Sequence, residues 1–549
     1  MWHPFEPLLV LFIVPMAFFA YWGGLWPKQI LWMILVGVAG LLIWSACAGG
    51  VEFARLQRMN LLVAAAAIAV VACRSLRLAG MGERRVYLAS LSLIALVAWV
   101  LYSNFFAFHG IGRERVFIHL HDVAHYYLGA KYFPELGYQS LYTGMLRAEA
   151  EKYDDHFRSL EARDLETNGL VDIRALLARS DAVKERFSAD RWTAFQDDVA
   201  FFRDGMKEQW GEVLRDHGFN PPPLWPLLGG ALANLVPAGS HAGILGLTLL
   251  DPVLLVAMFA SIAWAFGVES MLLASVYFCT IHGASFGWTG GGFLRYVWLA
   301  SLVRAVCCLK RDRHASAGAL LGVAAMLRIF PAWFIAPIAL LALKGVITRQ
   351  QVSARHVRFL LAFAATCAAL FSATLTLPAG LHHWQEFRHN MQRHVDSNAY
   401  NSIGLNEILS YTGPVKASNP EDFARELDWR RTTYRAQITV VLLLVIAVLG
   451  RRSRWPDNAS ATVLAIPLLF CTLSLAAYYY AFLILLVLAH GQSTWRIAAL
   501  FAVEALTCVL GLFESNQIVL FFYRNVLVAY LLLALYLGGL GAPGATRDA

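Results

Sequence analysis

Charged side chains are scarce in this chain of 549 residues, because Asp, Glu, Lys and Arg together make up only 15% of it. A soluble domain of ordinary composition carries about 25%. Hydrophobic residues reach 58%, and the mean hydropathy is +0.54. The shortage of charge excludes an ordinary soluble domain. Repeated apolar runs, each near the roughly 20 residues that cross a bilayer as a helix, predict an all-α polytopic membrane protein.

Two further absences narrow the class of protein. Every cysteine lies in an apolar run, so no polar loop holds a pair that would form a disulfide framework or a thiolate zinc site. The chain also lacks the Gly-rich P-loop pattern that binds nucleotide phosphates. The sequence therefore argues against an ATP-driven transporter. The cysteines are expected to behave as small apolar side chains.

The few charges are distributed unevenly. Residues 109–221 hold 15 basic and 20 acidic residues, a net charge of −5, whereas the rest of the chain has a net charge of +13. The basic residues of that remainder cluster in short connections, as at Arg451, Arg452 and Arg454. Short Lys/Arg-rich loops face the cytoplasm, so the basic character reports topology and predicts no nucleic-acid partner. We expect a multi-pass protein of a bacterial inner membrane, with its long loops periplasmic or extracellular.

The apolar runs predict one integrated membrane domain over residues 1–549, with about 11 to 14 transmembrane helices and two long external loops. We expect the first apolar stretch, residues 1–26, to be a retained helix, because it lacks the features of a cleaved signal peptide. Charges interspersed among apolar residues predict amphipathic interfacial helices in the loops. The predicted order is N-terminal transmembrane helices (1–108), first external loop (109–221), transmembrane core (222–378), second external loop (379–434), and C-terminal helices with a short tail (435–549).

Asp122 is the first candidate for chemistry. It follows the apolar run 86–108, at the point where the chain enters the first long loop. A carboxylate at a membrane–water boundary can take a proton from a bound hydroxyl group. Alternatively, Asp122 caps a helix or pairs with Arg113 or Arg115.

Two arginines stand in apolar surroundings. Arg295 follows the glycine run 290–292, and Arg328 lies within an apolar stretch. Placing an arginine at the centre of a bilayer costs about 3 kcal/mol on insertion scales, so such residues usually face a cavity or a partner. A guanidinium group suits a phosphate. The alternatives are an extended side chain that reaches the interface, or an ion pair with Asp251 or Glu504. The glycine run would admit a ligand close to the backbone, or serve helix packing.

Histidines surround Asp122. His121 and His125, four residues apart, would share one face of a helix, and together with His119 they form a group that can bind a divalent cation. Magnesium and manganese prefer oxygen ligands, which this imidazole-rich group does not supply. The other interpretation is a hydrogen-bonded group in which His125 orients Asp122 or an acceptor. No cofactor is predicted with certainty, and His121 and His125 are the candidate ligands if a metal binds.

The pattern around Asp122 resembles the GT-C superfamily of polytopic glycosyltransferases. The nearest branch is the polyprenyl-phosphate-mannose-dependent mannosyltransferases and related bacterial proteins. The shared features are an Asp early in the first large external loop, a pattern of aromatic and small residues that ends near Leu141 and Tyr142, an aromatic-x-Pro-Pro sequence before the next helix (219–222), and a basic residue before Phe-Pro (328–331). The resemblance extends over residues 100–410. The chain departs from it by having Arg328 where Lys is more usual, and by the number of apolar segments that precede the loop.

This resemblance implies transfer of a hexosyl or pentosyl group from a polyprenyl-phosphate donor to a lipid- or glycan-linked acceptor, as in cell-envelope glycolipid biosynthesis. Inversion at the anomeric carbon and Asp122 as the general base are expected. Candidate substrate-binding residues are His125, Tyr126, Tyr127, Lys131, Arg295, Arg328, His389, Arg393 and Asn401. Two other functions stay open: a flippase or transporter for a glycolipid or anionic lipid, and a polymerase or ligase that moves a glycan from a polyprenyl diphosphate. Tyr478, Tyr479 and Tyr480 are interpreted as an interfacial aromatic belt, with a sugar-stacking platform as the alternative.

Overall fold

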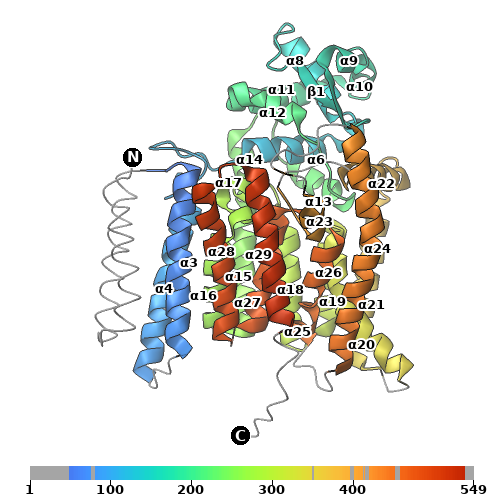
Figure 1. Cartoon of the computed structure of the whole chain (residues 1–549). Helices are drawn as coiled ribbons and strands as arrows, with labels where there is room; N and C mark the ends of the chain where they lie inside the picture. Colours follow the sequence, from blue (N-terminus) through green and yellow to red (C-terminus); the bar gives the residue numbers. More distant parts are fainter. Residues whose placement is uncertain are drawn as a thin grey trace.

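The computed structural model describes residues 49–75, 81–348, 352–395, 401–411, 413, 420–451, 458–491 and 493–537. Figure 1 shows a bundle of long helices with a smaller group of elements packed on one end. The expected retained helix at residues 1–26 lies outside the described residues.

Apolar helices confirm the prediction of an all-α polytopic membrane protein. In the described residues, seven helical segments are long and apolar enough to cross a membrane: Arg55–Ala72, Arg84–Tyr102, His241–Phe266, Phe330–Ile347, Ala354–Thr374, Thr494–Phe513 and Gln517–Tyr536. Shorter apolar helices pack among them, and a helix of 10 to 17 residues is too short to span about 30 Å of hydrocarbon alone. Among the described residues, helices long enough to cross a membrane therefore lie beside shorter apolar ones.

The bundle is built from helices contributed by both halves of the chain. α19 packs against α18 and α21, α28 packs against α3 and α29, and α16 packs against α4 and α15. In chain order, the helices of the bundle are α3 (Phe53–Ser75), α4 (Met81–Tyr102), α13 (Leu224–Ala233), α14 (His241–Thr248), α15 (Leu250–Phe266), α16 (Val268–Thr280), α17 (Phe286–Thr289), α18 (Val297–Lys310), α19 (His314–Leu327), α20 (Ala336–Ile347), α21 (Ala354–Thr374), α24 (Pro420–Arg451), α25 (Asn458–Thr462), α26 (Ala465–Thr472), α27 (Ile484–His490), α28 (Thr494–Phe513) and α29 (Gln517–Leu537).

A break in the helical path places Arg328 inside the bundle. α19 ends at Leu327, Arg328 is extended with φ −148° and ψ 119°, and a 3-10 helix, η4 (Phe330–Ile335), follows. Pro331 explains the break, because proline lacks an N–H and its ring excludes a continuing α-helix on its N-terminal side. The apolar run at 315–344 thus folds as two pieces, with an arginine at the junction.

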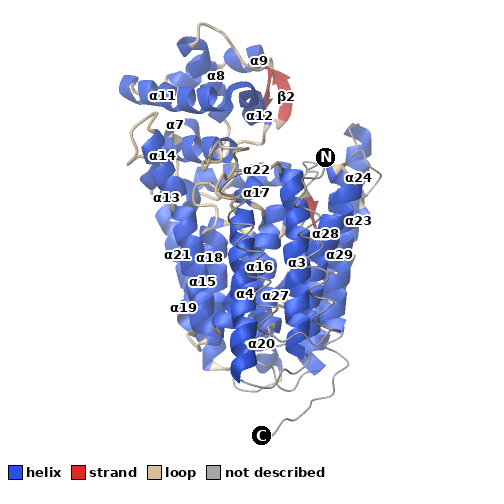
Figure 2. Ribbon diagram, turned by 90° about the vertical axis from the view of Figure 1, so that its left-hand side faces the viewer, coloured by secondary structure: helices blue, strands red, loops and turns tan. Residues whose placement is uncertain are grey.

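Residues 109–221, called the polar lobe below, form a folded unit at one end of the bundle (Figures 1 and 2). Helices predominate in it, and one antiparallel hairpin pairs Glu161 with Asp172. Apolar faces of α8 and α11 pack together around Phe195 and Phe202, both fully buried. Its elements are α5 (Leu120–Val123), the π-helical η1 (Ala124–Leu128), α6 (Gly129–Lys131), α7 (Phe133–Leu136), α8 (Leu141–Lys152), β1 (Glu161–Asp164), β2 (Gly169–Asp172), α9 (Ile173–Leu177), α10 (Ser180–Lys184), α11 (Ala189–Met206), η2 (Lys207–Gln209) and α12 (Trp210–Arg215).

A buried polar network fixes the base of the polar lobe. The Asp198 carboxylate lies 2.9 Å from Lys131 Nζ, accepts a hydrogen bond from the Tyr132 hydroxyl at 2.7 Å, and accepts one from the Gly239 N–H at 2.7 Å. Asp198 is fully buried. Gly239 precedes α14, so this network links the lobe to the bundle.

The second predicted loop also returns to the bundle. It contains α22 (Leu381–Val395), the short strand β3 (Ser402–Ile403) and α23 (Leu405–Leu409). Residues 420–434, the last part of the predicted loop, belong to α24, which begins at Pro420. β3 pairs with β4 (Leu475–Ala476), and the Asn401 carbonyl accepts a hydrogen bond from the Ala477 N–H at 2.8 Å. The 3-10 helix η5 (Ala477–Leu483) follows and carries Tyr478 and Tyr479.

Candidate functional site

Asp122 lies where the polar lobe meets the bundle. His119 is the N-cap residue of α5, and its Nδ1 accepts a hydrogen bond from the Asp122 N–H at 3.2 Å. The His119 N–H in turn donates to the Gly291 carbonyl at 3.0 Å. Gly291 has a φ of +67°, and a Cβ there would lie 1.8 Å from the Phe117 carbonyl oxygen. Only glycine therefore permits this close approach of the two chain segments.

An ion pair joins Asp122 to Arg295 across 173 residues of sequence. The carboxylate Oδ1 accepts from Arg295 Nη1, and both side chains are about nine-tenths buried. Asp122 therefore pairs with Arg295, and not with Arg113 or Arg115. The other oxygen, Oδ2, is buried and has no hydrogen-bond partner among the described residues. The Arg295 guanidinium lies 4.3 Å from the centre of the Tyr478 ring.

Asp251 holds the backbone of the segment that carries Arg295. Its carboxylate accepts hydrogen bonds from the Arg295 N–H at 3.0 Å and the Tyr296 N–H at 3.2 Å. Asp251 thus binds the backbone of Arg295, whereas the guanidinium group of Arg295 pairs with Asp122. The proposed alternative of a side-chain pair between Arg295 and Asp251 is not what the structure shows.

Arg328 lies beside the same tyrosines. Its Nη2 donates to the Tyr126 hydroxyl at 2.8 Å, and its guanidinium carbon lies 5.4 Å from the centre of the Tyr126 ring and 5.8 Å from that of Tyr479. Arg328 is buried, and its Nε has no partner among the described residues. Glu504 does not pair with it, because that carboxylate binds Arg524 at 2.9 and 3.1 Å.

We define the site cluster as Asp122, Tyr126, Arg295, Arg328, Tyr478 and Tyr479. It gathers two guanidinium groups and one carboxylate in a buried place, which leaves one positive charge in excess. Charge-assisted hydrogen bonds strengthen away from water, so such a place favours an anion with several acceptor oxygens. The unpartnered Nε of Arg328 and Oδ2 of Asp122 remain available as a donor and an acceptor.

The electrostatics keep Asp122 ionised. Burial by itself would raise the pKa of the Asp122 carboxyl, but the Arg295 guanidinium, helped by the neighbouring histidines, lowers that pKa below its ordinary value. Burial, together with His109 and Arg295, lowers the pKa of His119 to about 3. His119 is therefore neutral near pH 7, as its role as an acceptor at Nδ1 requires. Asp122 is therefore an ionised carboxylate, paired with Arg295, throughout the neutral range.

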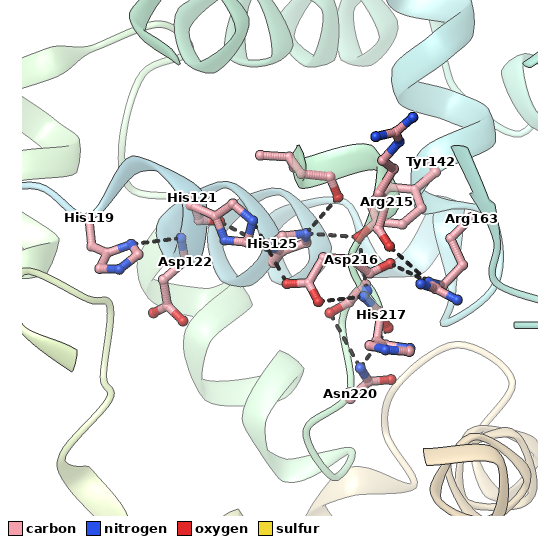
Figure 3. Close-up of polar contacts among 12 residues, drawn as sticks. His119, His121, Asp122, His125, Tyr142, Arg163, Arg215, Asp216, His217 and Asn220 are labelled. Atoms are coloured by element: carbon pink, nitrogen blue, oxygen red, sulfur yellow. Dashed lines mark hydrogen bonds and ion pairs between the residues drawn. The ribbon is translucent and has the colours of Figure 1, made fainter. Parts of the chain in front are cut away.

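The histidines face another direction. His125 is buried in η1, with Nδ1 2.8 Å from the His121 carbonyl oxygen and Nε2 2.8 Å from the Tyr142 hydroxyl. Figure 3 shows His121 and His125 on the side of the helix that faces Asp216, with the Asp122 carboxylate pointing away from them. His125 thus holds Tyr142 and not Asp122 itself.

Two predicted substrate contacts belong to the scaffold in this structure. Lys131 is buried in the ion pair with Asp198 and donates to the Tyr127 hydroxyl at 2.6 Å. The Tyr127 hydroxyl also lies 3.3 Å from Asp198. Their polar atoms are engaged inside the polar lobe, so Lys131 and Tyr127 do not join the site cluster.

The second loop contributes unequally. Asn401 lies next to the segment that carries Tyr478, through its bond to the Ala477 N–H. His389 is exposed on α22 and lies outside the site cluster as defined. Arg393 falls within the same helix, and its side chain is outside the described residues.

Sequence reasoning missed what Tyr478 and Tyr479 contact. The sequence favours an aromatic belt for this run, but Tyr478 and Tyr479 both lie beside the arginines of the site cluster. The aromatic run itself was visible in the sequence. Its proximity to Arg295 and Arg328 was not, because it depends on how η5 packs against α18 in the folded bundle. Asp216, which lies beside His121, was missed altogether.

The fold and the cluster define a multi-pass membrane protein with a buried, positively charged site beside a carboxylate. Residues 219–469 match the family model described as glycosyltransferase family 87. This match indicates a membrane glycosyltransferase, a transferase that acts on a sugar donor and an acceptor. The matched segment includes Arg295 and Arg328, whereas Asp122 precedes it. The comparisons with curated proteins and with solved structures give no match.

Proposed function

We propose that this protein transfers a hexosyl or pentosyl group from a polyprenyl-phosphate-linked donor to a lipid- or glycan-linked acceptor. The reaction takes place at the periplasmic or external face of a bacterial inner membrane. The observation that supports this best is the meeting of Asp122, Arg295 and Arg328 in one buried cluster where the polar lobe packs on the bundle. A donor of this class has its chain in the bilayer and its sugar phosphate at such a boundary.

The chemistry follows from the charges. Asp122 takes the proton of the acceptor hydroxyl while that oxygen attacks the anomeric carbon. The bond between the anomeric carbon and the phosphate oxygen breaks, and its electron pair leaves with the polyprenyl phosphate. Arg295 and Arg328 stabilise the phosphate as charge develops on the departing oxygen. Attack opposite the leaving group inverts the anomeric configuration.

Arg295 has two partners in this scheme. Without donor it pairs with Asp122, and a donor phosphate would compete with that carboxylate for the guanidinium. Donor binding would thereby release Asp122 toward the acceptor and make it a stronger base, because a nearby positive charge is what lowers its pKa. Tyr126 positions Arg328 through its hydroxyl, and Asn401 is proposed for donor contact. His125 is proposed to hold the Asp122 segment in place, and His389 and Arg393 stay predicted donor contacts.

The test is a donor screen with purified protein in liposomes. A panel of radiolabelled polyprenyl-phosphate sugars and polyprenyl-diphosphate glycans is supplied with a total-lipid acceptor extract, and labelled product and free carrier are measured. Asp122→Asn should lower turnover by about 10²- to 10⁴-fold, the range that a general base contributes, while keeping the wild-type elution profile and thermal stability. Asp181→Asn, at an exposed carboxylate of the polar lobe, is the matched control and should transfer sugar at the wild-type rate.

Wild-type turnover in Asp122→Asn would refute the assigned base, and loss of folding in that variant would make Asp122 a structural residue. Transfer only from a polyprenyl diphosphate would identify a glycan polymerase or ligase. Labelled lipid that crosses the bilayer unchanged, in a manner abolished by Arg328→Gln, would identify a transporter.

A further inference from the structure

A group of three potential ligands lies on the far side of the helix from the Asp122 carboxylate. His121, His125 and Asp216 each offer one ligand atom, and these atoms all lie within 4.8 Å of one another. The two histidines are one helical turn apart, and Asp216 follows α12. In Figure 3 the three side chains converge between η1 and the segment 216–220. We propose that they bind a divalent transition-metal ion, with Zn²⁺ as the best match.

The contacts around His125 hold its ring with Nε2 on the side of Asp216 and Nδ1 against the chain. Its Nδ1 lies 2.8 Å from the His121 carbonyl oxygen, and its Nε2 lies 2.8 Å from the Tyr142 hydroxyl and 3.2 Å from the Val213 carbonyl oxygen. A metal ion at Nε2 would replace the contacts with Val213 and with the Tyr142 hydroxyl, whose oxygen also accepts from the Gly218 N–H at 2.9 Å. Metal-binding histidines usually donate their other ring N–H to a carbonyl or carboxylate, and the His121 carbonyl is placed to accept from Nδ1 when Nε2 binds the ion.

Asp216 supplies the negative charge. Its Oδ1 accepts from the His217 N–H at 2.8 Å, and its Oδ2 lies 3.9 Å from His121 Nε2. Among the described residues, no arginine or lysine forms an ion pair with this carboxylate; Arg163 instead donates to the Asp216 backbone carbonyl. The Asp216 carboxylate is thus directed toward the two imidazoles.

The donor set selects the metal. Two imidazole nitrogens and one carboxylate oxygen suit Zn²⁺ or Co²⁺, whereas Mg²⁺ and Ca²⁺ require mostly oxygen ligands. Ligands about 2.0–2.2 Å from a tetrahedral ion lie roughly 3.4 Å from one another. Side-chain rotations that move the ligand atoms by about 1 Å would bring them to that spacing. The side chains of His121 and Asp216 are 33% and 44% exposed, which gives the ion access from solvent. A fourth position is left for water.

Such an ion would hold two segments next to the site cluster in a fixed relative position. His121 adjoins Asp122, and Asp216 begins the connection that leads to α13. The proposed role is to position the helix of Asp122 against that connection. It is independent of the sugar-transfer proposal, because the ion contacts neither Asp122 nor the arginines.

The test measures metal and not turnover. The full-length protein, purified with a tag that contains no histidine and stripped with EDTA, is titrated with Co²⁺ in detergent. We expect one equivalent to bind with the strong visible absorption of a four-coordinate site, and Zn²⁺ to displace it. His121→Ala, His125→Gln and Asp216→Asn should each weaken binding by more than about 100-fold, because even residues behind the ligands contribute 10- to 100-fold.

His156→Ala is the control, since His156 is an exposed histidine of the same lobe whose ring Nδ1 faces the backbone carbonyls of Tyr153 and Asp154. It should bind Co²⁺ as the wild type does. The proposal is overturned if the wild type binds no Co²⁺ or Zn²⁺, or if folded Asp216→Asn and His121→Ala bind them as tightly as the wild type does. Size-exclusion profiles establish which variants are folded, and His125→Gln, at the most buried ligand, is judged only beside the other two.

Discussion

An Asp198→Asn substitution tests whether Lys131 is part of the scaffold that fixes the polar lobe. Asparagine keeps the shape of the side chain and removes its charge. Lys131, whose side chain is 5% exposed, would then hold an ammonium group with no counterion. Breaking one side of a buried ion pair costs about 3–5 kcal/mol. Since about 1.4 kcal/mol corresponds to a factor of ten, the population of opened lobe should rise by roughly 100- to 4,000-fold.

Limited trypsin digestion of the purified protein measures this opening. Cleavage within residues 109–221 proceeds from the opened lobe, so its rate should rise in proportion to that population when reclosing is fast. Asp181→Asn serves as the control, because that carboxylate is 73% exposed and exposed ion pairs contribute little. Its digestion rate should stay within about twofold of the wild type.

A wild-type digestion rate in Asp198→Asn would refute the scaffold role. If the same variant also showed a raised KM for the sugar donor, Lys131 would return to the substrate-binding residues. Adding Lys131→Met to Asp198→Asn should recover part of the lost resistance, because it removes the unpaired ammonium group.

Two further substitutions test the site and the bundle. In Gly292→Ala the new Cβ would lie 2.9 Å from Asp122 Oδ2. Displacement of the carboxylate should lower the sugar-transfer rate by about tenfold or more. Gly246→Ala is the control, because its Cβ would meet nothing within 4 Å, and it should leave that rate unchanged. Glu504→Gln leaves the fully buried Arg524 without its counterion, at a cost of about 3–5 kcal/mol. It should lower the temperature at which the detergent-solubilised protein aggregates. An unchanged aggregation temperature would contradict the inferred importance of this pair.

Long apolar helices were the most predictable part of the fold. The run 495–513 corresponds to α28 and 358–378 largely to α21, because a bilayer demands about 20 consecutive apolar residues and leaves a clear pattern. Charged segments gave weaker signals. The helical pattern of the polar lobe was visible, but its core was not, because α8 and α11 meet through contacts that sequence periodicity does not encode. The start of α24 at Pro420 was missed because its first part is polar.

The charged members of the site were recognisable for a physical reason. An arginine in an apolar stretch is costly and usually has a partner or a ligand, which singled out Arg295 and Arg328. Which carboxylate would pair with Arg295 was not predictable, because Asp122 is 173 residues away in the sequence. Lys131 is the opposite case. It is close to Asp122 in sequence, but its ammonium group binds Asp198 inside the lobe.

The ion pair between Asp122 and Arg295 also has a consequence for biosynthesis. The Asp122 carboxylate belongs to the polar lobe and the Arg295 guanidinium to the bundle, so neither part alone contains both charges of the pair. During synthesis the bundle segment that holds Arg295 emerges only after the whole lobe, and the pair forms when the two parts dock. A chain whose lobe has folded but not docked would retain an unpaired arginine at the mouth of the bundle. Completion of tertiary assembly and completion of the site are therefore the same event.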